Sequence, residues 1–165
     1  MRATQKMLEL DRDRGWVTKK SADGGIDFVT MLPVGSIQSG EGGDIASTNV
    51  VVLGQAKCIK PDNVVSGKDV ARLVARLKRG WIGVFVTTGV FGEAVQKEIA
   101  EDSYPVICIN GKKLSEQLRL LMNETGKDLE EFLEEQAEWY NKNLQEAKPE
   151  DVIENADLTP VLNDT

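Results

Sequence analysis

Hydrophobic and polar positions along the first half of the chain predict two strands that pair. Residues 26–31 alternate between apolar and polar side chains, which places Asp27 on the opposite face from Phe28. Residues 49–59 include an uninterrupted apolar run at 50–53, which is typical of a buried central strand. Because a glycine- and serine-rich loop joins them, we expect these two segments to form a hairpin.

The second half alternates between helical and strand patterns. Ser66 precedes apolar residues at helical spacing, which predicts a helix from 66 to 79 that ends at Gly80. Short links then connect the remaining predicted elements: a strand at 82–87, a helix at 91–101, a strand at 106–109, a helix at 113–122 and a last helix at 129–144. Such a series predicts an α/β fold with a mixed central sheet flanked by helices.

The two ends of the chain have weaker patterns. A short helix at 3–12 and a short strand at 16–19 are expected before the hairpin. One apolar stripe is predicted on the last helix, formed by Leu129, Phe132, Leu133, Ala137 and Tyr140. It is expected to dock on the domain, although Trp139 and Tyr140 leave an oligomer interface open. Residues 147–165 are acidic and contain two prolines, as in a loosely ordered tail.

Composition narrows the class of protein. With 165 residues, 41% apolar and 28% charged, the chain has the composition of one globular domain. Its apolar runs are far shorter than the roughly 20 residues that span a bilayer. Its first residues lack the apolar core of a signal peptide, so a cytoplasmic location without membrane contact is expected.

The chain contains no histidine, which removes many catalytic mechanisms from consideration. Ser-His-Asp and Cys-His nucleophile systems and histidine-based zinc sites are excluded. The two cysteines, Cys58 and Cys108, are expected to be buried thiols in strands without a redox role. Carboxylates, amides, lysines, hydroxyls and a hard metal held by oxygen ligands remain.

Charge is distributed unevenly along the chain. The net charge of −7 argues against a nucleic-acid partner when it is taken alone. However, residues 1–80 carry 13 Lys and Arg against 9 Asp and Glu, whereas residues 81–165 carry 7 against 18. A basic first half therefore keeps nucleic acid among the candidate partners.

Three polar residues fall at the ends of the two paired strands. Gln55 and Lys57 share a face because they are two residues apart, and pairing of the strands brings Asp27 to them. Asp and Gln oxygens suit Mg²⁺, and a lysine can orient an attacking water and offset charge on a phosphodiester. Taken singly, Asp27 also fits a turn residue and Lys57 a solvated strand end.

A basic ridge is predicted on the helix at 66–79. Opposite its apolar stripe the residues are spaced by four, four and three: Lys68, Arg72, Arg76 and Arg79. The alternative is an ordinary solvated helix face with basic residues near its C-terminus. DNA-backbone contact is favoured because only Asp69 opposes these charges, and Lys60, Lys19 and Lys20 would extend the same surface.

Three sequence blocks resemble a known nuclease group. Gly24-Gly25-Ile26-Asp27-Phe28-Val29, Leu53-Gly54-Gln55-Ala56-Lys57-Cys58 and Val84-Phe85-Val86-Thr87-Thr88-Gly89 resemble the Mrr-like branch of the PD-(D/E)xK nuclease superfamily. Residues 71–81 look similar to the endonuclease domain of modification-dependent restriction enzymes related to AspBHI and MspJI. The resemblance covers about residues 12–120.

The resemblance implies a role for each matching residue. Asp27 and Gln55 would be metal-site residues for Mg²⁺, and Lys57 would be the catalytic lysine. Ile26 replaces the proline of the superfamily name, which is common in this branch. The first family helix often supplies a glutamate, and here Glu9 is the available acid.

A restriction-like endodeoxyribonuclease of type II or IV is therefore the expected activity. Its partner would be double-stranded DNA, with target recognition in a separate domain or subunit. A catalytically weak DNA-binding or scaffold module, or a nuclease acting on RNA or single strands, is the alternative. The expected organisation is a nuclease domain at 1–123, an acidic helix at 124–146 and an acidic tail at 147–165.

Overall fold

The computed structural model describes residues 1–10, 15–18, 25–34 and 48–143. The expected acidic tail, and the proposed contacts of Lys19 and Lys20, lie outside these residues. None of the described helices is long and apolar enough to cross a membrane.

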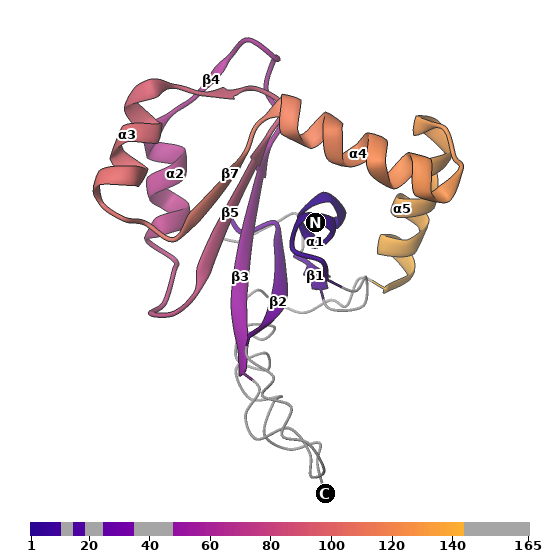
Figure 1. The fold of residues 1–165 in the computed structure, drawn as a ribbon, viewed down its shortest axis with the longest axis horizontal. Helices are drawn as coiled ribbons and strands as arrows, with labels where there is room; N and C mark the ends of the chain where they lie inside the picture. Colours follow the sequence, from indigo (N-terminus) through magenta and orange to yellow (C-terminus); the bar gives the residue numbers. More distant parts are fainter. Residues whose placement is uncertain (11–14, 19–24, 35–47, 144–165) are drawn as a thin grey trace, which may run out of the picture.

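A five-stranded mixed sheet forms the centre of the fold, as the sequence predicts (Figure 1). Its order is β1-β2-β3-β5-β7; the first three strands are antiparallel, and β3, β5 and β7 are parallel. The strands span Gly15–Val17 (β1), Phe28–Val34 (β2), Thr48–Lys57 (β3), Ile82–Thr87 (β5) and Val106–Ile109 (β7). A separate parallel pair consists of β4 (Val64–Val65) and β6 (Val90–Phe91).

The predicted hairpin is confirmed and corresponds to β2 and β3. Phe28 pairs with Gly54, and the register continues to Val34 opposite Thr48. Gly54 has no side chain at the point where the Phe28 ring crosses it, and a Cβ there would lie 2.0 Å from Phe28 Cζ. The glycine therefore permits the close approach of the two strands just before the Gln55 position.

Helices cover both faces of the sheet, and each face has its own apolar cluster (Figure 1). On one face, α2 (Gly67–Val74) and α3 (Glu93–Glu101) pack over a core that includes Val51, Leu53 and Phe85. On the other, α1 (Arg2–Met7) and α4 (Gly111–Thr125) cover a core that includes Val52 and Val84. Adjacent strand residues enter opposite clusters because side chains alternate across a sheet.

Helix α2 is shorter than its sequence pattern predicts. The prediction of a helix reaching residue 79 is wrong, because α2 ends at Val74. After Val74 the backbone hydrogen bonds join residues three apart, as in a 3₁₀ turn. Arg76 N donates to Leu73 O and Leu77 N to Val74 O, both at 3.0 Å. This turn keeps Leu77 against the core and leads to Trp81, which is 7% exposed. The apolar spacing alone does not distinguish such a turn from a continuing helix.

Helix α5 (Leu129–Asn143) begins as predicted but buries a different face. Phe132 and Gln136 are buried, whereas Leu129 and Leu133 are 48% and 50% exposed. The predicted single apolar stripe is therefore wrong. Packing against the rest of the fold selects the side of the helix that carries Phe132 and Gln136, four residues apart.

Other helix ends differ from prediction by a few residues for local reasons. Helix α3 starts at Glu93 because Phe91 pairs in β6. Helix α4 begins after Asn110, whose side chain accepts a hydrogen bond from Lys113 N at 2.9 Å. It ends at Gly126, which adopts the left-handed conformation at φ 68°.

Candidate active site

Asp27 lies just before β2 and is held against the end of β3. Its backbone N donates to Gly54 O at 2.8 Å, so Asp27 and Phe28 both lie opposite Gly54, as in a β-bulge. Its carboxylate Oδ2 accepts a hydrogen bond from Ala56 N at 2.6 Å. The carboxylate is thus fixed beside the strand residue that separates Gln55 from Lys57.

Gln55 and Lys57 lie on the α2 face of the sheet. Gln55 is opposite Phe85 in the parallel β3–β5 register, and Phe85 belongs to the core beneath α2. Ala56, between them, points to the other side and is exposed. Asp27 reaches this strand end through its carboxylate, which accepts the hydrogen bond from Ala56 N, the residue between Gln55 and Lys57. The structure therefore brings Asp27, Gln55 and Lys57 to one strand end.

The Gln55 side chain has an oxygen that needs a partner. Gln55 is 7% exposed, and its Oε1 is buried with no hydrogen-bond partner in the described part of the chain. A buried unsatisfied acceptor costs on the order of 1–3 kcal/mol. A cation bound there would remove this cost, so Gln55 Oε1 and the Asp27 carboxylate fit a hard, oxygen-preferring metal ion. No cluster of three His, Cys, Asp or Glu side chains occurs in the described residues.

Lys57 is paired with Asp69, which the sequence shows only as the acid opposing the basic residues of the predicted helix at 66–79. Its Nζ donates a hydrogen bond to the carboxylate of Asp69 in the first turn of α2. Ser66 Oγ donates to the same Asp69 oxygen at 2.6 Å. Burial raises the pKa of Asp69, but hydrogen bonds from Lys57 and Ser66 outweigh it and hold that pKa below its usual value. No sequence motif points to the Lys57–Asp69 contact.

Arg72 borders the site from the next turn of α2. Gly25 adopts φ +85°, and a Cβ at this position would lie 3.1 Å from Arg72 Cδ and 3.6 Å from Gln55 Nε2. The stem of Arg72 therefore crosses Gly25 close to Gln55. Its exposed guanidinium is available to solvent at the edge of the candidate site.

The other predicted DNA-contacting residues do not form one helical ridge. Lys68 and Arg72 are on α2, but Arg76 and Arg79 lie beyond its end at Val74. The predicted spacing along a single helix is therefore wrong, because the chain tightens after that residue. All four side chains are exposed, as is Lys60, which follows β3.

Glu9 is not part of the first helix. Helix α1 ends at Met7 and contains no acidic residue, and Glu9 follows it with an exposed side chain and φ 54°. The prediction of a helix from 3 to 12 is therefore wrong at its C-terminal end, and Glu9 lies beyond the helix that forms. The buried polar positions of α1 are instead Thr4 and Gln5.

The residues around Lys57 are anchored to β5. The Thr87 hydroxyl donates to Lys57 O at 2.9 Å and accepts from Gly89 N at 3.0 Å. Cys58 is exposed because β3 ends at Lys57, and Cys108 is only partly buried, so the expectation that both thiols are buried is wrong. Cys108 lies within β7, where burial raises the pKa of its thiol to about 11.

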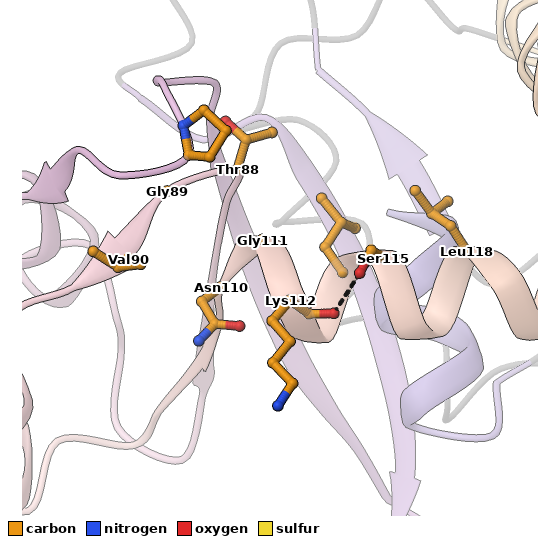
Figure 2. A pocket seen from close by; sticks show the side chains of 10 residues that line it. Thr88, Gly89, Val90, Asn110, Gly111, Lys112, Ser115 and Leu118 are labelled. Atoms are coloured by element: carbon orange, nitrogen blue, oxygen red, sulfur yellow. Dashed lines mark hydrogen bonds between the residues drawn. The ribbon is translucent and has the colours of Figure 1, made fainter.

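An open cavity of 560 Å³ lies beyond the ends of β5 and β7 (Figure 2). Thr88, Asn110 and Lys112 line it together with mainly apolar groups, at the start of α4. Asp27, Gln55 and Lys57 are not among its lining residues. The cavity is therefore separate from the candidate active site.

The fold and the site define a restriction-endonuclease-like domain, with a mixed sheet that carries an Asp and a Gln-x-Lys pair at one strand end. The chain belongs to the restriction endonuclease family, whose Mrr catalytic-domain model matches residues 4–118. The family resemblance found in the sequence is thereby confirmed.

Two solved structures extend this assignment. The chain is 42% identical to the MspJI restriction endonuclease in complex with a 27-mer oligonucleotide, with a TM-score of 0.73 over 92% of this chain. It is 31% identical to the DNA modification-dependent restriction endonuclease AspBHI, with a TM-score of 0.57 over 72% of this chain. The alignments cover only 34% and 29% of those two chains, respectively. A comparison with curated proteins found no match.

Proposed function

We propose that the chain is the catalytic domain of a Mg²⁺-dependent endonuclease that hydrolyses phosphodiester bonds of double-stranded DNA. The observation that carries this proposal is the convergence of Asp27, Gln55 and Lys57, with Gln55 Oε1 buried and unpaired in the described structure. The MspJI relative was solved with an oligonucleotide, which supports a nucleic-acid substrate.

Each residue of the site has its own role in the proposed reaction. Asp27 and Gln55 would hold the metal ion through oxygen atoms. When bound, Mg²⁺ would polarise the phosphoryl group and favour ionisation of the attacking water. Lys57 supplies an ammonium that orients that water and offsets negative charge in the transition state. The hydrogen bond from the Ala56 backbone amide would hold the Asp27 carboxylate in position during catalysis.

Target selection is assigned to another part of a larger protein or to a separate subunit. The chain corresponds to about a third of the length of each restriction enzyme it matches. Exposed Arg72 borders the site, and it would contact phosphates of any sequence together with exposed Lys60, which follows β3, and Lys68, in the first turn of α2. A restriction system that acts on foreign or modified DNA therefore fits the family, with specificity supplied from outside these residues.

Cleavage of supercoiled plasmid tests the proposal. Mg²⁺ should support nicking by the wild-type chain, and Asp27→Ala or Lys57→Ala should each lower the rate by about 100-fold or more. Asp62→Ala, which removes an exposed acid, is the matched control and should cut normally. Circular dichroism should show that all variants are folded.

The same assay separates the alternatives. A DNA-binding or scaffold module would bind duplex without cutting it in Mg²⁺. A nuclease for RNA or single strands would cut an RNA duplex or single-stranded DNA faster than the plasmid. Cutting by the folded Lys57→Ala variant at the wild-type rate would contradict the assignment of the site.

A further inference from the structure

Helix α2 begins beside the candidate active site, and Asp69 in its first turn contacts Lys57. The two residues belong to α2 and β3, twelve positions apart, and meet because the helix packs on the sheet face that carries Gln55. The Lys57 side chain is 39% exposed and that of Asp69 15% exposed. The ammonium thus lies at the surface, whereas the carboxylate that holds it is largely shielded.

The Asp69 carboxylate is itself fixed in position. Its Oδ2 receives the Ser66 hydroxyl at 2.6 Å as well as the Lys57 ammonium, and the Ser66 backbone also hydrogen bonds to the carboxylate. Ser66 is the N-cap of α2, so the acceptor of the lysine is built into the start of a helix. With its pKa held below the usual value, Asp69 is negatively charged at neutral pH.

A lysine at a strand end needs a partner such as Asp69 if its ammonium is to stay at one position in the active site. Its four-carbon side chain is flexible, and an unrestrained ammonium samples several positions in solvent. An ammonium has three N–H donors, so a bond to Asp69 leaves donors for water and phosphate oxygen. The contact therefore orients Lys57 without using up its hydrogen-bonding capacity.

We propose that Asp69 is a positioning residue that holds the Lys57 ammonium in place for phosphodiester cleavage. This inference rests on the proposed function and extends the site from the sheet to the first turn of α2. Asp69 acts through Lys57 and needs no contact with DNA or metal. Its negative charge is the property that matters.

The competing role is structural, because Asp69 also belongs to the N-terminal cap of α2. Two variants separate the roles. Asp69→Asn keeps an acceptor oxygen for Ser66 but removes the charge that pairs with Lys57. Ser66→Ala removes the hydroxyl hydrogen bond of the cap but leaves the charged pair. The Ser66 side chain makes no hydrogen bond to the described backbone of α2, so this variant tests the loss of its bond to Asp69 alone.

Single-turnover plasmid cleavage in Mg²⁺ and duplex affinity in Ca²⁺ provide the functional test. Asp69→Asn should cut at least about 10-fold more slowly while binding DNA as well as or better than wild type, because a negative charge near the phosphates is lost. Asp69→Glu, which restores the charge, should cut faster than Asp69→Asn. Ser66→Ala should have a lower Tm but cut within about threefold of wild type.

Reductive methylation followed by mass spectrometry tests the restraint without any need for cleavage. Lys57 should react several-fold more slowly than exposed Lys60 in the wild-type chain and in Ser66→Ala. In Asp69→Asn it should react faster, since its partner charge is gone. Lys60 provides an internal reference within each sample.

Specific results overturn the inference. In the cleavage assay, it fails if Asp69→Asn cuts as fast as wild type, or if Ser66→Ala loses as much activity as Asp69→Asn. It also fails if Asp69→Glu is no faster than Asp69→Asn. In the methylation assay, it fails if Lys57 reacts at the same rate in Asp69→Asn and in wild type. A wild-type chain that does not cut contradicts the proposed function and the positioning role with it. The methylation rates would then still show whether Asp69 restrains Lys57, so the two failures are distinguishable.

Discussion

The carboxylate of Asp27 accepts a hydrogen bond of 2.6 Å from the backbone amide of Ala56, the residue between Gln55 and Lys57. This contact ties the acid before β2 to the strand that carries the amide and the lysine. Its existence depends on the β2–β3 register, because a slip of one residue would move the side chains to the opposite face of the sheet. The hairpin is thus part of the site as well as of the fold.

Substitutions at Gln55 test the proposed metal site. Gln55→Glu should retain Mg²⁺-dependent cleavage because an oxygen donor stays in place with an added negative charge. Gln55→Leu should lose about 100-fold or more in rate, since its side chain has no donor for the ion. Plasmid nicking across a Mg²⁺ titration measures both effects. A Leu variant with wild-type metal dependence would show that Gln55 is only structural.

The salt dependence of DNA binding tests Arg72. If its guanidinium contacts a phosphate, Arg72→Ala should lower the slope of log affinity against log salt concentration by about 0.9. Arg119→Ala is the matched control because this exposed arginine lies on α4, on the other face of the sheet. Titrations in Ca²⁺ measure binding of both variants. Equal slopes for wild type and Arg72→Ala would remove Arg72 from the DNA surface.

The close approach of Gly54 to Phe28 predicts a large effect on stability. Gly54→Ala should lower the free energy of unfolding by about 3 kcal/mol, because the new methyl overlaps a buried ring. Gly67→Ala at the start of α2 is the control, since its Cβ meets only Glu98 Oε2 at 3.5 Å. It should change stability by about 0.5 kcal/mol or less. Urea unfolding measures both values.

The two cysteines should differ in reactivity. Iodoacetamide at about pH 8 should label exposed Cys58, whereas Cys108, with a pKa of about 11, has about one thiolate in a thousand at that pH. Mass spectrometry of the folded chain measures the labelling, and both residues should react after unfolding. Rapid labelling of Cys108 in the folded chain would contradict its burial.

The raised pKa of Cys108 also predicts a pH dependence of stability. The unfolded chain releases this proton near pH 9, before the folded chain does near pH 11. The unfolding free energy should therefore fall as pH rises through this window, with no contribution from Cys108 below it. A Cys108→Ser variant should show a weaker decline when urea unfolding is measured across the same range.

Strands could be predicted from the sequence where the pattern of hydrophobic residues matches the burial seen in the structure. The strands at 82–87 and 106–109 have the predicted ends, and the 50–53 run lies in the central part of β3. Alternation along β3 also predicts that Gln55 and Lys57 share a face, whereas the contact of Asp27 with Ala56 occurs where the alternation of β2 is broken opposite Gly54. The family assignment follows from the same segments.

Only the tertiary structure decided where α2 ends, which side of α5 is buried and which residue holds Lys57. The spacing from Val70 to Leu77 fits both a helix and a tighter turn, and packing of the chain toward Trp81 selected the turn. The sequence shows Asp69 only as the acid among the basic residues of the predicted helix, and its contact with Lys57 arises when α2 packs on the sheet. Local patterns encode preferences of the backbone and of side-chain burial, whereas contacts between distant elements depend on how those elements pack together.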